Sequence, residues 1–172
     1  MNELNYASFG KLLIKLQFLE TIIKLFISLC NSSVKENKKY RIKELSSRNI
    51  LDNNTEKTKQ TLGQLMIIIK SEIPNFDNAE FKELLSKRNK FIHSFHKEFL
   101  SKKEIDEKEV TKFIEKLWSL TDKYTKVFTG LISISAKSIG KGKVSVEEIE
   151  EDEKHLYNYL IENSKQTAYN ND

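Results

Sequence analysis

Residues 84–96 bring together side chains that could bind a phosphate and move a proton. The segment reads Leu-Leu-Ser-Lys-Arg-Asn-Lys-Phe-Ile-His-Ser-Phe-His and holds two of the chain's three histidines, His93 and His96. The guanidinium of Arg88 offers N–H donors in a geometry that suits phosphate oxygens. An imidazole such as that of His93 takes up and releases protons near neutral pH. Arg88 and His93 are therefore candidate catalytic residues, with Asn89 between them in the sequence and His96 in a supporting role.

A helix would place these side chains close to one another. At about 100° per residue, Arg88 falls on the margin of an apolar face. That face is made by Leu84, Ile92 and Phe95. The adjoining stripe is polar and consists of Asn89, His93, His96 and Lys97. A cation at the edge of a core, beside an imidazole, is a compact unit for phosphate chemistry.

Glu20 is the second supporting residue, because it interrupts an apolar stretch near the N-terminus. An unpaired carboxylate among apolar side chains is costly. A pair with Arg88 would satisfy both charges and fix the orientation of the guanidinium. The alternative partner is Lys24, four residues on, in a pair worth only roughly a few tenths of a kcal/mol.

The elements that must position these residues are all helical. Apolar positions recur every three or four residues, which predicts an all-α fold, an antiparallel helical bundle of about five helices. The expected helices span residues 4–30, 54 or 55 to 71, 79–100, 106 to about 138 and 145 to about 162. Pro74 ends the second helix and Asp77 or Asn78 caps the third. Capping-box patterns open the last two, at residues 106–109 and 145–148.

The segments between the helices are polar. Residues 34–54 are basic and form either a short helix or a loop, and residues 139–143 read as a glycine-containing loop. The acidic run 147–153 is expected to be a solvated face. The predicted organisation is one helical domain over residues 1–165, followed by a frayed polar tail at 166–172.

Composition excludes several classes of protein. With 172 residues, 38% of them hydrophobic and 31% charged, the chain is globular rather than disordered. The formal net charge of +4 permits a polyanionic partner. Charged residues interrupt the apolar segment 12–29, which argues against a membrane span and for a cytoplasmic protein. One cysteine and no Cys/His cluster with zinc spacing predict neither a metal nor another cofactor.

The motif carries a family resemblance. Arg88-Asn89-Lys90-Phe91-Ile92-His93 matches an R-x4-H pattern, and with it the chain resembles the HEPN-domain family, in particular its small bacterial ribonucleases and toxins. Phe18-Leu19-Glu20 and Thr61-Leu62-Gly63-Gln64-Leu65 are similar to segments of such proteins. The resemblance implies a HEPN-like helical bundle.

The same resemblance implies an endoribonuclease that needs no metal. The 2′-hydroxyl of RNA would attack the adjacent phosphorus and leave a 2′,3′-cyclic phosphate. His93 would act as general base or acid, Arg88 would stabilise the charged phosphate, and Asn89 would orient the substrate or the imidazole. Family members usually work as homodimers with their motifs facing each other. The implied setting is a toxin–antitoxin pair or phage defence, with an antitoxin protein as a candidate partner besides RNA.

Two other functions stay open on the sequence. The chain could be a non-catalytic HEPN module that binds RNA, a nucleotide or a protein. It could also be a structural helical dimer in which Arg88, Glu20 and His93 form a polar network. Elsewhere, Trp118 is expected in the core or a dimer interface, and His155 on the surface.

Overall fold

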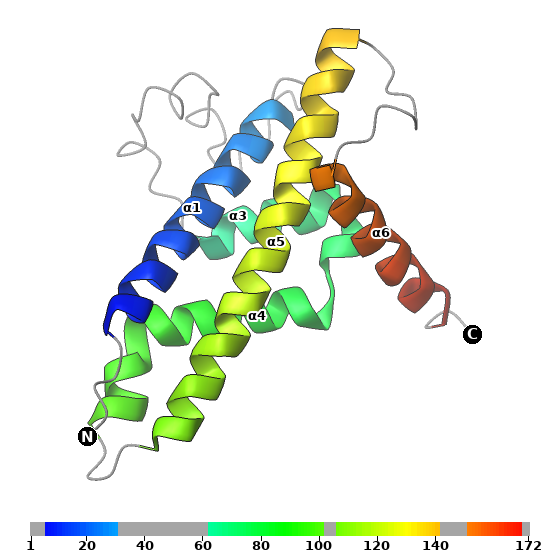
Figure 1. Ribbon diagram of the computed structural model, residues 1–172. Coiled ribbons are helices and arrows are strands. Elements are labelled where there is room, and N and C mark those ends of the chain that lie inside the picture. The colour runs from blue at the N-terminus through cyan, green and yellow to red at the C-terminus, as the bar shows by residue number, and fades with distance from the viewer. Residues whose placement is uncertain (1–5, 31–61, 102–105, 142–150, 170–172) are drawn as a thin grey trace.

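Every element of the computed structural model is a helix (Figure 1). The structure describes residues 6–30, 62–101, 106–141 and 151–169, and no strand occurs among them. The predicted all-α helical bundle is confirmed. The basic segment 34–54, the start of the second helix and the capping pattern at 145–148 lie outside the described residues.

In the described part of the chain, five helices and three short helical segments follow one another. They are α1 (Tyr6–Cys30), α3 (Leu62–Glu72), η4 (Pro74–Phe76), α4 (Ala79–Asn89), η5 (Lys90–Ser94), η6 (His96–Leu100), α5 (Glu107–Lys141) and α6 (Glu151–Tyr169). The segment η4 is a 3₁₀ turn, whereas η5 and η6 are π-helical turns that continue α4.

Local capping explains where α4 and α5 begin. The side chain of Asn78 accepts a hydrogen bond from the backbone N–H of Phe81 at 2.9 Å. Asp106 accepts from the backbone N–H groups of Lys108 and Glu109, both at 3.0 Å. These bonds satisfy amides that have no partner inside the helix. The predicted caps at residues 78 and 106 are confirmed.

The helix formed by α4, η5 and η6 runs antiparallel to α1. Phe9, near the start of α1, meets Phe95 with ring centres 5.3 Å apart, while Glu20, further along α1, meets Arg88. As the residue number rises on one helix it falls on the other. This crossing brings the middle of α1 to the sequence motif.

The same helix also runs antiparallel to α5, since Glu80 pairs with Lys123 whereas Phe99 packs on Phe113. Two helices that are both antiparallel to a third must be parallel to each other. Accordingly, α1 and α5 run side by side in the same direction, and α6 returns antiparallel to α5 (Figure 1). The bundle is thus antiparallel between α5 and α6 but not between α1 and α5.

One hydrophobic core joins the described helices, and its aromatic rings form two groups. The first lies where η4, α4, α5 and α6 meet and contains Phe76, Phe81, Tyr124, Phe128 and Tyr159. The second lies beneath the π-helical turns and contains Phe9, Phe91, Phe95, Phe99 and Phe113. The second group anchors the part of the chain that carries the motif.

Two helices extend further than the sequence predicted. The expected loop at 139–143 is wrong for its first residues, because α5 remains helical through Gly140 to Lys141. A glycine costs only about 1 kcal/mol inside a helix, so a single glycine does not by itself end one. Likewise α6 continues past Glu162 to Tyr169, since no glycine or proline follows to end it. The expected tail therefore begins inside a helix.

The prediction of a solvated acidic run is wrong at its last residue. Glu153 is fully buried between α5 and α6. Its carboxylate lies 2.8 Å from the ammonium of Lys137 and accepts a 2.6 Å hydrogen bond from the Ser133 hydroxyl. A buried carboxylate is tolerated only when it is paired in this way.

Candidate active site at the end of α4

Arg88 lies one residue before the end of α4, on the side that faces α1. Its side chain is 18% exposed, so the guanidinium is at the edge of the core, as predicted. One terminal nitrogen lies 3.3 Å from a carboxylate oxygen of Glu20, and the other donates to the side-chain oxygen of Asn89 at 3.1 Å. Two neighbours therefore orient the arginine.

Glu20 is shared between two cations. Its second carboxylate oxygen lies 3.0 Å from the ammonium of Lys24, so both pairs considered for Glu20 exist together. The three charges sum to +1. A carboxylate flanked by two cations fixes their positions and still leaves the cluster attractive to a phosphate.

A surface groove of about 360 Å³ adjoins this cluster. Arg88 and Ile92 form one wall, and residues of α1, among them Leu13, Gln17 and Glu20, form the other. The groove thus has cationic groups, Arg88 and Lys24, beside walls of mixed polar and apolar character.

The helix changes its winding at the motif. The N–H of Lys90 is shared between the carbonyls of Lys87 and Ser86, and the two π-helical turns follow. At the far end, the N–H of Ser101 bonds to the carbonyl of His96, five residues back. Such turns are rare and are frequent at functional sites.

The π-helical turns overturn one prediction and agree with another. Ile92 is 38% exposed rather than in the core, because these turns hold more residues than an α-helical turn and the assumed 100° spacing fails. The predicted polar stripe is nevertheless present. Its members Asn89, His93, His96 and Lys97 are all exposed.

His93 lies on η5, one turn beyond Arg88, with its imidazole open to solvent. Within the described part of the chain, no hydrogen bond or ion pair links it to Arg88, and it does not line the groove. His96 lies on η6 and is likewise exposed. One chain therefore brings together Arg88, Asn89 and Glu20, and presents His93 separately on the adjoining surface.

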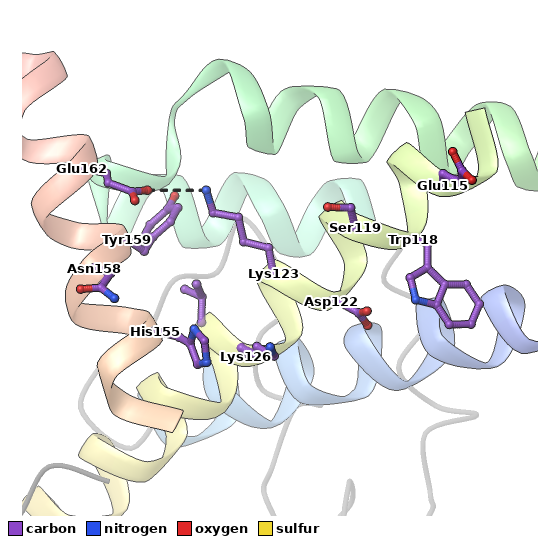
Figure 2. Close-up of a pocket in the computed structure, with 11 residues that line it drawn as sticks. Glu115, Trp118, Ser119, Asp122, Lys123, Lys126, His155, Asn158, Tyr159 and Glu162 are labelled. Carbon is purple, nitrogen blue, oxygen red and sulfur yellow. Dashed lines mark ion pairs between the residues drawn. The ribbon is translucent and has the colours of Figure 1, made fainter. Parts of the chain in front are cut away.

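A second groove, which the sequence did not indicate, lies between α5 and α6. It measures about 650 Å³, and Trp118, Lys126 and His155 are among its walls (Figure 2). His155 is therefore half-buried rather than an ordinary surface residue. Trp118 packs partly against the core, as expected, with the ammonium of Lys15 at 4.2 Å from its ring centre.

Several charged side chains of the second groove are paired, within it or with residues beside it. Lys123 lies 3.7 Å from Glu162 across the groove (Figure 2). Lys123 also lies 2.7 Å from Glu80, and Asp122 pairs with Lys15, both partners being outside the groove lining. Helical spacing on α5 and α6 could have indicated this groove, but only once the two helices were known to be neighbours. Its paired charges make it a weaker candidate for chemistry than the Arg88 cluster.

Among the described residues, no three His, Cys, Asp or Glu side chains gather closely enough to hold a metal ion, and no helix is long and apolar enough to cross a membrane. No family model, no curated protein and no solved structure matches the chain.

Proposed function

We propose that this protein is a metal-independent endoribonuclease of the HEPN type that works as a homodimer. The observation that carries the proposal is the Arg88 guanidinium, oriented by Glu20 and Asn89 at the wall of a groove. The exposed imidazole of His93 on the next turn and the resemblance of the R-x4-H motif add to it. The same resemblance favours a cytoplasmic toxin or phage-defence effector that acts on RNA and is restrained by an antitoxin protein.

The chemistry requires one proton to leave and one to arrive. A base removes the proton of the 2′-hydroxyl, whose oxygen then bonds to phosphorus. The bond from phosphorus to the 5′-oxygen breaks, and that oxygen takes a proton from an acid. An imidazole suits either task near neutral pH, and two imidazoles, one from each copy of His93, serve both.

Arg88 stabilises the negative charge that grows on the non-bridging phosphate oxygens. Glu20 is a positioning residue, because it acts on the substrate only through Arg88. Asn89 accepts a hydrogen bond from Arg88 through its oxygen, so its amide N–H₂ group remains available to a phosphate or a base. His96 is exposed on the same stripe and adds a phosphate contact.

The test is cleavage of total RNA and tRNA by the purified protein in buffer with EDTA. Wild type should release fragments with 5′-hydroxyl and 2′,3′-cyclic phosphate ends. His93→Ala should lower the rate by about 100-fold or more, the usual size of a general acid–base contribution. Because His93 is exposed, the helical circular dichroism should not change.

His155→Ala is the matched control, since it removes the histidine that lies away from the motif. It should retain wild-type cleavage. Equal loss in both histidine variants, or no cleavage of any RNA by wild type, contradicts the proposal. Retained RNA binding without cleavage would favour the non-catalytic binding module.

The structural alternative rests on the same cluster, because Glu20 already compensates Arg88 and Lys24 within the chain. If that network only stabilises the fold, Arg88→Ala lowers the melting temperature and leaves cleavage per folded molecule unchanged. A catalytic Arg88 instead gives a large loss of cleavage at temperatures where the variant is fully folded.

A further inference from the structure

The outer side of α1 carries an uncharged surface in a highly charged protein. We define the α1 face as Gly10, Leu13, Ile14, Gln17, Phe18 and Thr21, which are spaced so that they share one side of the helix. All six are exposed, although 31% of the whole chain is charged. Exposure of large apolar side chains is marked, at 39% for Leu13, 66% for Ile14 and 57% for Phe18.

This surface continues onto η5 and reaches the candidate active site. Ile92, 38% exposed, and Leu13 are opposite walls of the groove that contains Arg88. Of the six large hydrophobic residues that are exposed in the described part of the chain, four therefore border this one region. The other two, Tyr157 and Ile161, lie on α6.

Gly10 adds a separate indication. A Cβ atom built on it would meet no atom within 4 Å, so the fold of this chain does not require a glycine there. A residue without a side chain does allow another backbone to approach closely. Gly10 therefore leaves room on this side of α1 for a second backbone.

We propose that the α1 face is the contact through which a second copy of this chain binds, in an antiparallel α1–α1 pair about a two-fold axis. The opposite side of α1 is already buried against the core through residues such as Leu12, Leu19 and Ile23. A helix that is apolar all round is normally buried all round. A two-fold contact sets a surface against itself, so like charges at its centre would repel each other. The α1 face carries no charge, and Lys11, the charged side chain among the exposed residues of α1, lies at its edge.

The arrangement would complete the candidate active site. The Arg88 groove runs along one flank of the α1 face, through Leu13, Gln17 and Glu20. In an antiparallel pair, the two-fold axis stands perpendicular to the helices. The flank of α1 that carries the groove then lies on the same side of the pair in both copies. The two grooves, and the two exposed His93 side chains beside them, would then lie together. This step rests on the proposed function, whereas the contact itself does not.

A second copy fits this surface better than a lipid bilayer does. Helices that lie on membranes present a broad polar face rich in Lys and Arg to water, whereas the far side of α1 is protein core. A typical stable contact buries roughly 800 Å² per partner, so we expect residues around Ile92 to contribute beside the α1 face. We therefore expect a dimer that dissociates in the micromolar range.

Sedimentation equilibrium of the full chain from about 1 to 200 µM tests the contact without RNA. Wild type should approach twice the chain mass of 20.1 kDa, whereas Phe18→Glu and Ile14→Glu should remain monomeric. Ile161→Glu is the matched control, because it adds the same charge at an exposed apolar residue of α6. It should dimerise like wild type. A monomeric wild type, or variants that dimerise normally, overturns the proposal.

A cross-linking experiment identifies what covers the face. With Cys30→Ser removing the only native thiol, Gln17→Cys should be joined to a second chain by a short bis-maleimide, whereas Lys112→Cys on the exposed side of α5 should not. A monomer whose Cys-substituted position 17 resists maleimide would show that the chain covers its own face. A monomer that pellets with anionic phospholipid vesicles would assign the face to a membrane. Either result overturns the proposal, and neither depends on ribonuclease activity.

Discussion

At the scale of single residues, the site depends on how Arg88 is held. The guanidinium is bound to Glu20 through one nitrogen and to Asn89 through the other, and only 18% of the side chain is exposed. A flexible arginine would lose conformational entropy on binding each phosphate. An arginine that is already oriented avoids much of that cost, which is the basis of electrostatic preorganisation.

Replacing Glu20 by Gln should test whether the charge of Glu20, rather than the size of its side chain, orients Arg88. Gln keeps the shape of the side chain but removes the charge that holds Arg88, so cleavage should fall by about 10-fold or more. The free energy of unfolding should fall by about 1.5–3 kcal/mol, the range for hydrogen bonds to charged groups. Urea unfolding and initial cleavage rates measure the two effects.

Lys24→Met is the control for that experiment. It breaks the other pair of Glu20 but leaves the contact with Arg88 in place. We expect a stability change of only roughly 0.2–0.5 kcal/mol, as for other pairs one helical turn apart, and a smaller loss of cleavage than for Glu20→Gln. If Lys24→Met impairs cleavage as much as Glu20→Gln, Glu20 does not act through Arg88.

Sequence predicted the Glu20–Arg88 contact because a carboxylate in an apolar helix must find a cation. It did not predict the burial of Glu153, since the surrounding acidic residues read as a solvated face and Lys137 lies on another helix. It also failed for Ile92, because regular α-helical spacing was assumed through the π-helical turns. Contacts between distant segments and changes of helix winding have no local signature.

At the scale of elements, the polar side chain of Asn78 ties three helices together. It caps α4 through Phe81, donates to the hydroxyl of Tyr159 on α6 at 2.6 Å, and accepts from that of Tyr124 on α5 at 3.2 Å. Both tyrosines are almost completely buried. Sequence predicted the cap, but not the tyrosines, which come from helices far along the chain.

Removing this side chain should therefore cost more than removing an ordinary cap. Asn78→Ala should lower the free energy of unfolding by about 2–4 kcal/mol, because it removes a cap and leaves two buried hydroxyl groups with fewer partners. Asp106→Ala removes the exposed cap of α5 and should cost about 1 kcal/mol. Urea unfolding of both variants checks the difference, and equal costs would show that the tyrosine bonds add no stability.

The same tyrosines should make the fold sensitive to alkali. Burial raises the pKa of Tyr159 to about 12 and raises the pKa of Tyr124 far above its usual range. Above pH 10 the unfolded chain releases these protons while the folded chain keeps them, so stability falls as the pH rises. Each tyrosine should contribute about 1.4 kcal/mol per pH unit between pH 10 and 12.

Urea unfolding at pH 9, 10 and 11 measures that dependence. Replacing both tyrosines by Phe should lower stability at pH 9 and flatten the decline above pH 10. Tyr157→Phe, at an exposed residue of α6, should keep the wild-type slope. A double variant with an unchanged slope would place the alkaline sensitivity elsewhere, for example in the ion pairs of lysine.

At the scale of the whole molecule, the antiparallel crossings decide which surfaces remain open. The helix formed by α4, η5 and η6 runs antiparallel to both α1 and α5, so α1 and α5 are parallel to each other. The α1 face points away from the core. The helical class of the fold followed from apolar spacing. This arrangement did not, since spacing shows which face of a helix is buried but not which neighbour covers it.

A site shared between two copies should allow complementation between inactive chains. Arg88→Ala and His93→Ala homodimers should both be inactive, each for lack of one functional group. When the two are mixed and allowed to exchange, mixed dimers contain one intact Arg88 and one intact His93 across the two-fold axis. Because one His93 then serves one proton transfer and water must serve the other, cleavage should rise above that of either homodimer but stay well below the wild-type rate. Adding Phe18→Glu to both chains should abolish that recovery because it prevents pairing. Recovery that persists with Phe18→Glu would mean that the copies meet through another surface. No recovery in a mixture proven to contain mixed dimers would mean that a working site needs Arg88 and His93 from the same chain, or both copies of each residue.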